Sequence, residues 1–204
     1  AIRQDPDVHL EGLLHSKPIT YWDYIHTDAL LSLQIQRTEF PDEMVFISYH
    51  QINELVFKMI LWEIRQVAEA SPLSLSFFKD KLMRISRYFD MLTTSFDIMR
   101  DGMDVLQYNK FRQTLTPASG FQSAQYRLIE FASTERINLI DVRFRKKIDT
   151  NTSFEEAFDH LYWQAAGKDF KTGQKSILLI NFENRYKNEF KTFMEAYASK
   201  NLWS

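Results

Sequence analysis

The sequence lacks cysteine altogether and has no long apolar run. Without cysteine there is no disulfide framework, no thiolate nucleophile and no cysteine-ligated metal, a composition that suits a reducing compartment. No stretch approaches the roughly 20 apolar residues of a membrane span. The first residues, 1–7, show no apolar core of the length that a signal peptide needs. We therefore expect a soluble, cytoplasmic protein with no membrane partner.

An excess of one charge is also missing. The chain has 25 Lys and Arg against 27 Asp and Glu, a formal net charge of −2, and the two signs are mixed along the sequence. A nucleic-acid-binding surface needs a basic patch or stripe, and none appears. We expect no nucleic acid among the partners.

Glycine is scarce and aromatic residues are abundant. Only five glycines occur in 204 residues, whereas 15% of the residues are aromatic, including 17 Phe. Few glycines imply few tight turns and hence long helices, and so many rings imply a bulky core with flat surfaces for a ligand. Because no repeat or Gly/Ser linker divides the chain, we predict a single helical domain over 1–204.

The apolar residues recur at helical spacing almost throughout. The segments predicted as helices are 21–34, 41–70, 74–99, 107–115, 119–147, 154–166 and 175–198. The strongest begins at Pro41-Asp42-Glu43, an N-terminal signature, and would extend about 42 Å at 1.5 Å per residue. The inward positions of 74–99 would be Phe77, Phe78, Leu82, Ile85, Phe89, Leu92 and Phe96. Since β-branched alternation never persists, the predicted class is all-α, a bundle of long helices.

One of the five histidines stands out as a candidate for chemistry. His50 lies mid-helix among residues expected to face the core, with Phe46 one turn before it and Glu54 one turn after it. On periodicity alone, a hydrogen-bonded core histidine is the commoner explanation. His26 and His160 lie on predicted helices without a paired ligand, and no HExxH or Glu-x-x-His pair supports a zinc or di-iron site.

A second candidate is the segment Tyr108-Asn109-Lys110-Phe111-Arg112. Its helical spacing puts a phenol and a guanidinium on one face, and the two together can bind one carboxylate through a bidentate pair and a hydroxyl hydrogen bond. The alternative is an exposed arginine stacked on an aromatic ring, which is commoner for an arginine taken at random.

Three blocks of this sequence resemble the tryptophan 2,3-dioxygenase family, in order and at fitting separations. They are Tyr21-Trp22-Asp23-Tyr24, the run from Phe40-Pro41-Asp42-Glu43 through His50-Gln51 to Glu54-Leu55, and Tyr108 to Arg112 with Pro117-Ala118-Ser119-Gly120-Phe121-Gln122-Ser123. The resemblance extends over essentially the whole chain, including Leu161-Tyr162-Trp163, and is to bacterial forms that carry Phe-Pro-Asp-Glu.

The resemblance implies a haem-dioxygenase fold and a metal-binding oxidoreductase whose cofactor is haem b, which contains iron. The enzyme would convert its substrates, L-tryptophan and O2, to N-formyl-L-kynurenine. This reaction is the first step of tryptophan catabolism by the kynurenine pathway. The family also implies a homotetramer whose pockets are shared between subunits.

Residue roles are implied by the same resemblance. His50 corresponds to the distal histidine above the haem, close to the indole nitrogen, and Phe46 to the ring that packs on the indole. Tyr108 and Arg112 fall where the family binds the tryptophan carboxylate. The remaining matches are Leu115 lining the pocket, Tyr21 and Tyr24 closing the pocket of a neighbouring subunit, and Ser119 and Gly120 against the haem.

The sequence departs from the family at the iron ligand. The family's iron-ligating proximal histidine and its Thr-Gly-Gly loop belong to a C-terminal third, so the chain corresponds to the N-terminal two-thirds and the ligand is expected beyond Ser204. His160 is the only histidine after Arg112, and its context resembles a non-ligating part of the family. Two alternatives therefore stay open: a haem-dependent monooxygenase or hydroxylase of an aromatic amino acid on the same fold, and a catalytically silent helical protein that binds tryptophan or only assembles.

Overall fold

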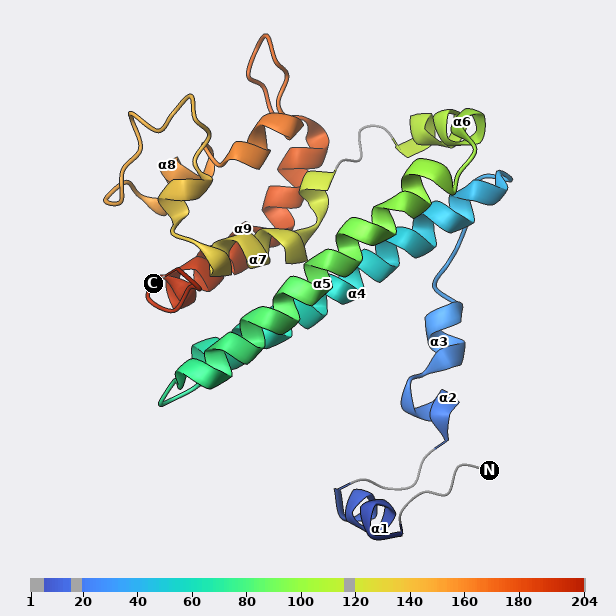
Figure 1. Ribbon diagram of the computed structural model, residues 1–204. Coiled ribbons are helices and arrows are strands. Elements are labelled where there is room, and N and C mark those ends of the chain that lie inside the picture. Colours follow the sequence, from blue (N-terminus) through green and yellow to red (C-terminus); the bar gives the residue numbers. More distant parts are fainter. Residues whose placement is uncertain (1–5, 16–19, 116–119, 204) are drawn as a thin grey trace. The chain divides into compact units, whose positions relative to one another are not determined.

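The computed structural model describes residues 6–15, 20–115 and 120–203 (Figure 1). The chain forms two compact units, residues 1–37 and residues 38–204. Ser119 and the side chain of Leu115 lie outside the described part, so the predictions for them stay predictions. So does the prediction of a single domain.

The described residues of the first unit form three short helices, α1 (Pro6–His15), α2 (Tyr21–Tyr24) and α3 (Thr27–Leu31). The prediction of one helix over 21–34 is wrong, because His26 adopts the left-handed conformation at φ 54°, ψ 49° and interrupts the helical backbone. Helix α1 was not predicted, although it begins with proline and has Asp7 in its first turn, a favourable N-terminal pair.

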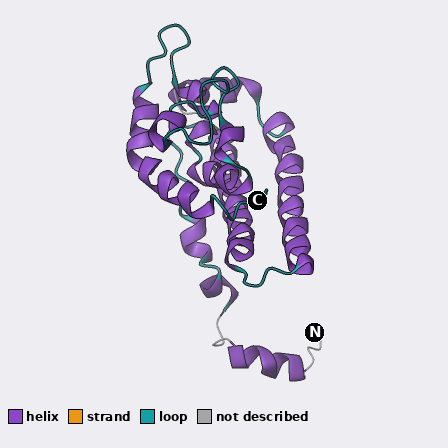
Figure 2. Cartoon of the chain, turned by 90° about the vertical axis from the view of Figure 1, so that its left-hand side faces the viewer, coloured by secondary structure: helices purple, strands orange, loops and turns teal. Residues whose placement is uncertain are grey.

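The second unit is also helical. Its α-helices are α4 (Pro41–Glu69), α5 (Leu75–Asp101), α6 (Val105–Leu115), α7 (Ala124–Ser133), α8 (Phe154–Phe158) and α9 (Ile177–Tyr197), with 3-10 helices at Gly120–Gln122, Arg136–Leu139 and Tyr162–Gly167. Within the described ranges, extended pairing is limited to two isolated bridges, Ile140 with Leu161 and Lys168 with Lys175. The predicted all-α class is confirmed (Figure 2). No described helix is both long enough and apolar enough to cross a membrane.

Helices α4 and α5 form a long antiparallel pair (Figure 1). Pro41 begins α4 with two acidic residues in its first turn, and the Ser74 side chain caps α5 by accepting a hydrogen bond from Phe77 N at 3.3 Å. The apolar seam between the helices is completed by α7. Its buried members are Val56, Ile60, Ile64, Ile85, Ile129 and Ala132.

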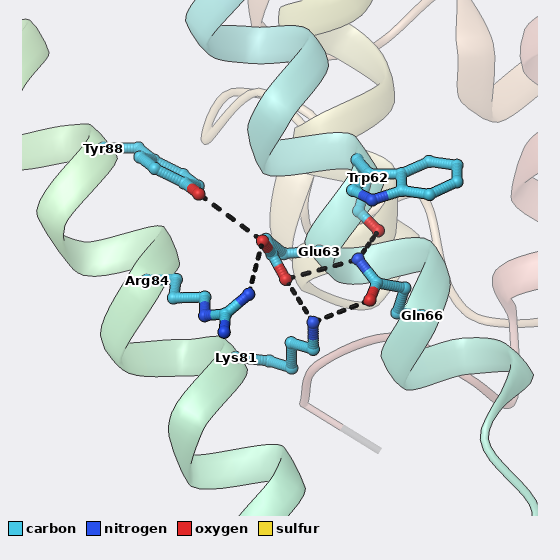
Figure 3. A network of polar contacts seen from close by, with 6 residues as sticks. All are labelled: Trp62, Glu63, Gln66, Lys81, Arg84 and Tyr88. Atoms are coloured by element: carbon cyan, nitrogen blue, oxygen red, sulfur yellow. Dashed lines mark hydrogen bonds and ion pairs between the residues drawn. The ribbon is translucent and has the colours of Figure 1, made fainter. Parts of the chain in front are cut away.

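A buried ion network also joins α4 to α5 (Figure 3). Lys81 Nζ lies 2.6 Å from Glu63 Oε2 and 2.7 Å from Gln66 Oε1, and both members of the Lys81–Glu63 pair are almost fully buried. Arg84 and Tyr88 reach the other carboxylate oxygen of Glu63 at 3.4 Å each. Each carboxylate oxygen thus has donors from α5, which offsets part of the cost of burying the charge.

The remaining helices enclose a second, aromatic-rich core. Its buried residues come from the 3-10 helix before α7, from α7, α8 and α9, and from the segments between these helices: Phe121, Phe131, Leu139, Ile140, Ile148, Ala157, Phe158, Leu161, Trp163, Leu179, Phe182 and Phe190. Ser123, Ser153 and Ser176 cap the three helices through their side-chain oxygens.

The predicted helix over 119–147 is confirmed only for α7, because a separate 3-10 helix precedes α7 at Gly120–Gln122 and α7 ends at Ser133. Thr134 is extended (φ −154°, ψ 168°), and after the short 3-10 helix Ile140 pairs with Leu161 while Asp141 N donates to His160 O at 2.9 Å. The apolar side chains of this stretch reach the aromatic core from backbone that is not α-helical, so helical spacing alone was misleading. The predicted helix over 154–166 also breaks, since Leu161 is extended between α8 and the following 3-10 helix.

Two inward positions predicted for α5 are wrong. Leu82 is 37% exposed and Phe96 is 58% exposed, whereas Ile85 is 6% exposed. Helix α5 packs chiefly on α4, so only one face of it is covered within this unit.

Candidate functional site

The N-terminal half of α4 carries two of the predicted site residues. Phe46 and His50 are four residues apart, so they lie on one face, and their ring centroids are 4.1 Å apart at an interplanar angle of 37°. His50 Nδ1 lies 2.8 Å from the main-chain oxygen of Phe46. Tyr49 meets the imidazole edge-on with centroids 5.4 Å apart.

His50 does not face the core. Its side chain is exposed, while the adjacent Tyr49 is 7% exposed and occupies the inward position. Successive residues of a helix point about 100° apart, so the buried face that runs through Tyr49 and Val56 excludes His50. The expectation of a core-facing histidine is therefore wrong, and so is the alternative that His50 is a buried core residue.

Helix α6 adds an aromatic pair against Phe46. Phe111 is fully buried, with its ring edge-on to Phe46 at 5.6 Å and to Tyr108 at 5.5 Å. Tyr108 itself lies 6.2 Å from Phe46 between ring centroids. Phe111 was missed by sequence reasoning, although its position three residues after Tyr108 was a signal for a shared helix face.

Arg112 extends this surface with a charge. Its guanidinium lies 5.7 Å from the centroid of the Tyr108 ring, and its side chain is exposed. The stacked arrangement matches the commoner explanation for such an arginine. It also brings a phenol and a guanidinium onto one surface of α6.

Polar contacts fix the start of α6 against the start of α4. Asp104 N donates to Asp42 Oδ2 at 2.6 Å, and Asp42 N donates to Gln107 Oε1 at 3.4 Å. Asp104 Oδ1 in turn accepts from Gln107 N at 2.9 Å in the first turn of α6. The Asp42 contacts span more than sixty residues of sequence, so they set where Tyr108 stands relative to Phe46.

A buried carboxylate stabilises the same end of α4. Glu43 is 3% exposed, and its Oε2 accepts from Thr38 N at 2.7 Å and from Thr38 Oγ1 at 2.6 Å. The neighbouring Phe40 ring lies 5.5 Å from Lys110 Nζ on α6. The Pro-Asp-Glu sequence therefore does more than begin a helix: it ties the preceding loop and α6 to α4.

The other predicted site residues belong to the first unit, to the segment before α7 or to the part outside the described residues. Tyr21 and Tyr24 are on α2 in the first unit, 73% and 71% exposed. Gly120 begins the 3-10 helix before α7, next to the buried Phe121. The structure thus brings together Phe46, His50, Tyr108 and Arg112.

Two further histidines, His26 and His160, have described surroundings. His26 forms the left-handed junction between α2 and α3, and His160 lies in a turn with its ring 4.2 Å from Phe144. Neither lies on a helix, contrary to the prediction. In the part of the chain that the structure describes, no group of three or more His, Asp or Glu is arranged to hold a metal ion.

The family of the chain that carries these residues follows from comparison with known protein families. A sequence model of the family described as "Tryptophan 2,3-dioxygenase" matches residues 10–168, which contain Phe46, His50, Tyr108 and Arg112. The chain belongs to this family. The resemblance seen in the three sequence blocks is confirmed.

Individual relatives agree with the family match. Tryptophan 2,3-dioxygenase from Ruegeria sp. (strain TM1040) is 42% identical over 120 residues, which are 58% of this chain and 42% of the relative. The enzyme of the same name from Ruegeria pomeroyi is 39% identical over 130 residues, 62% of this chain and 46% of the relative. Tryptophan 2,3-dioxygenase from Bacillus thuringiensis (strain Al Hakam) is 36% identical over 141 residues, which are 64% of this chain and 48% of the relative. The chain spans less than half the length of these curated relatives.

Proposed function

We propose that the complete protein is a haem-dependent dioxygenase that opens the indole ring of L-tryptophan with O2 to give N-formyl-L-kynurenine. The observation that carries this proposal is the convergence of Phe46, His50 and Tyr108 with Arg112 from two helices, α4 and α6. A surface that combines apolar rings, one imidazole and one guanidinium is suited to an aromatic amino acid.

The amino-acid end of the substrate would be held by α6. Arg112 would form a bidentate pair with the carboxylate, and the Tyr108 hydroxyl would donate a further hydrogen bond. The guanidinium lies 5.7 Å from the centroid of the Tyr108 ring, so the two groups are neighbours before a ligand binds. Fixing this end leaves the indole positioned along the ring of Phe46.

His50 would recognise the indole nitrogen. With Nδ1 within hydrogen-bond distance of the Phe46 carbonyl oxygen, the proton of a neutral imidazole belongs on Nδ1. Nε2 then carries a lone pair and accepts from the indole N–H. This role orients the substrate and requires no proton transfer by His50.

The residues present fit one face of a haem. The imidazole of His50 is exposed between the rings of Phe46 and Tyr49, and Gly120, which carries no side chain to obstruct a flat ring, is the residue that would lie against it. Ser119 would be the second contact. When bound, haem supplies the activation of O2 that protein side chains cannot provide. The proximal iron ligand stays unassigned.

Tyr21 and Tyr24 would close the pocket of a neighbouring subunit in a homotetramer. Both rings are more than two-thirds exposed on α2, so they are available to cover another surface. A monodisperse monomer in light scattering would remove this shared-pocket role.

The test is an absorption spectrum of the haem-reconstituted protein with and without L-tryptophan, followed by mass spectrometry of the product formed under 18O2. We expect a Soret band that shifts on addition of tryptophan and a product that contains two labelled oxygen atoms. A single labelled atom would favour a monooxygenase or hydroxylase, and a shift without turnover would favour a silent tryptophan-binding protein.

A further inference from the structure

A polar clamp joins α7 to α4 close to His50. The side-chain nitrogen of Gln125, Nε2, donates to the main-chain oxygen of Glu54 at 2.8 Å and to Glu54 Oε2 at 2.9 Å. Both side chains are half-buried. One amide group thus uses its two N–H donors on one residue of the opposite helix, which fixes the amide in both position and rotation.

The two ends of the clamp lie next to the proposed site on both helices. Glu54 is one turn after His50, about 6 Å farther along the axis of α4. Gln125 is in the first turn of α7, which begins directly after the 3-10 helix Gly120–Gln122 and its cap Ser123. The contact therefore connects the helix that carries the imidazole to the segment that carries Gly120.

Apolar and aromatic contacts also hold these segments. Next to the clamp, the rings of Phe57 on α4 and Tyr126 on α7 have centroids 5.3 Å apart. Helix α7 continues beside α4 over the apolar seam (Figure 1). Phe121 anchors the 3-10 helix in the aromatic core, stacked at 6.3 Å on Trp163. Apolar contacts tolerate small sliding movements, whereas a two-point hydrogen bond does not. The clamp is a directional contact at this end of α7.

We propose that Gln125 is a positioning residue that holds the Gly120 segment and His50 at the mutual spacing that the cofactor requires. This inference rests on the proposed function, because it assigns the two sides of the clamp to one haem. Gln125 acts through Glu54 and the helix backbones and touches neither substrate nor cofactor.

The experiment uses Gln125→Glu in the complete protein. A glutamate at position 125 has the same shape but no N–H, so it would face the Glu54 carboxylate and a carbonyl oxygen with acceptors only. We expect the affinity for haem, from a Soret titration, to fall by about 10-fold, as is typical for loss of a residue that orients a ligand-holding group. The tryptophan-induced shift of the Soret band should shrink in parallel, while the far-UV circular dichroism stays unchanged.

Rescue and control variants make the result specific. In Glu54→Gln/Gln125→Glu the side-chain hydrogen bond is restored with reversed donor and acceptor, and at least half of the loss in haem affinity should be recovered. Glu54→Gln alone keeps an acceptor and should bind haem as the unmodified protein does. The matched control is Gln66→Glu. The amide of Gln66 also donates to a main-chain oxygen (of Trp62) and to a carboxylate (of Glu63), but it lies far from His50 on α4 (Figure 3). The control variant therefore loses the same kind of contact at a distance from the site. It should leave haem affinity unchanged.

The outcomes separate this inference from the proposed function. If the unmodified protein takes up haem and responds to tryptophan but Gln125→Glu behaves the same, the positioning role is wrong. Equal losses in Gln125→Glu and Gln66→Glu, or no recovery in the double variant, would also overturn it by indicating a general effect on the fold. If the unmodified protein takes up no haem, the proposed function itself fails.

Discussion

Two regions of α4 differ in the burial and the hydrogen-bond partners of their polar side chains. Glu63 is buried and receives donors from Lys81, Arg84 and Tyr88. His50 lies 13 residues earlier, about 20 Å away along the helix axis. It is exposed, and its Nδ1 lies within hydrogen-bond distance of the main-chain oxygen of Phe46 on the same helix. The same helix satisfies a charge within the fold at one place and presents an imidazole outward at the other. The first group therefore serves stability, and the second is available to a ligand.

The greatest loss of stability is expected in the buried network. Glu63→Ala leaves Lys81 buried without its carboxylate, and we expect the free energy of unfolding to fall by about 3–5 kcal/mol. Urea unfolding followed by circular dichroism measures this loss. Glu63→Gln, which keeps an acceptor for Lys81, should lose less. A decrease below about 1 kcal/mol in Glu63→Ala would contradict the assignment of Glu63 to stability.

The same network predicts a direction for the pH dependence of stability. Burial raises the pKa of Glu63, but the hydrogen bond and charge of Lys81, with Arg84, outweigh it and hold this pKa below its ordinary value of 4.5. A carboxyl with a lowered pKa in the folded state stabilises the protein above the unfolded value, and that contribution is lost as the pH falls through the folded value. Below about pH 4.5, unfolding free energy should therefore fall less steeply for Glu63→Gln than for the unmodified protein.

At the other region the effect should appear in binding. Arg112→Ala should weaken the binding of L-tryptophan by about 2–5 kcal/mol if the guanidinium holds the carboxylate in a closed site. Indole, which has no carboxylate, should not distinguish the variant from the unmodified protein in a spectral titration. Arg100→Ala, which removes an exposed arginine paired with Asp97 and Asp101 on α5, is the control. A change near zero would remove Arg112 from the site.

The least change in stability is expected at His50. His50→Ala removes an exposed side chain, so the free energy of unfolding should change by about 0.5 kcal/mol or less. The loss of one hydrogen bond to the substrate should nevertheless lower kcat/KM by about 10-fold. Loss of folding in this variant would place His50 with Glu63 among the structural groups and end the distinction between the two regions.

Most of the helices could be predicted because their signals are local. Pro41 and the acidic turn after it mark the start of α4, and Ser74 marks the cap of α5. Failures occurred where a distant partner decided the backbone. Ile140 has helical spacing from its apolar neighbours, yet it pairs with Leu161, and His26 breaks a segment that is otherwise suited to a helix.

The candidate site divides in the same way. Its chemical groups, Phe46, His50, Tyr108 and Arg112, could be selected from the sequence because their types and spacing resemble a known family. The residues that arrange them could not. Nothing local links Asp42 to Asp104, or Glu54 to Gln125, since each pair is separated by more than sixty residues.

The all-α class, the ends of the long helices and the family could all be inferred from the sequence, because capping, periodicity and motif identity depend on neighbouring residues. The tertiary structure was needed to establish that Tyr49 takes the inward position and leaves His50 exposed, and that α6 and α7 are each tied to α4 by side-chain hydrogen bonds. Burial and long-range hydrogen bonds depend on which helix faces pack together, and this is settled when the chain folds as a whole.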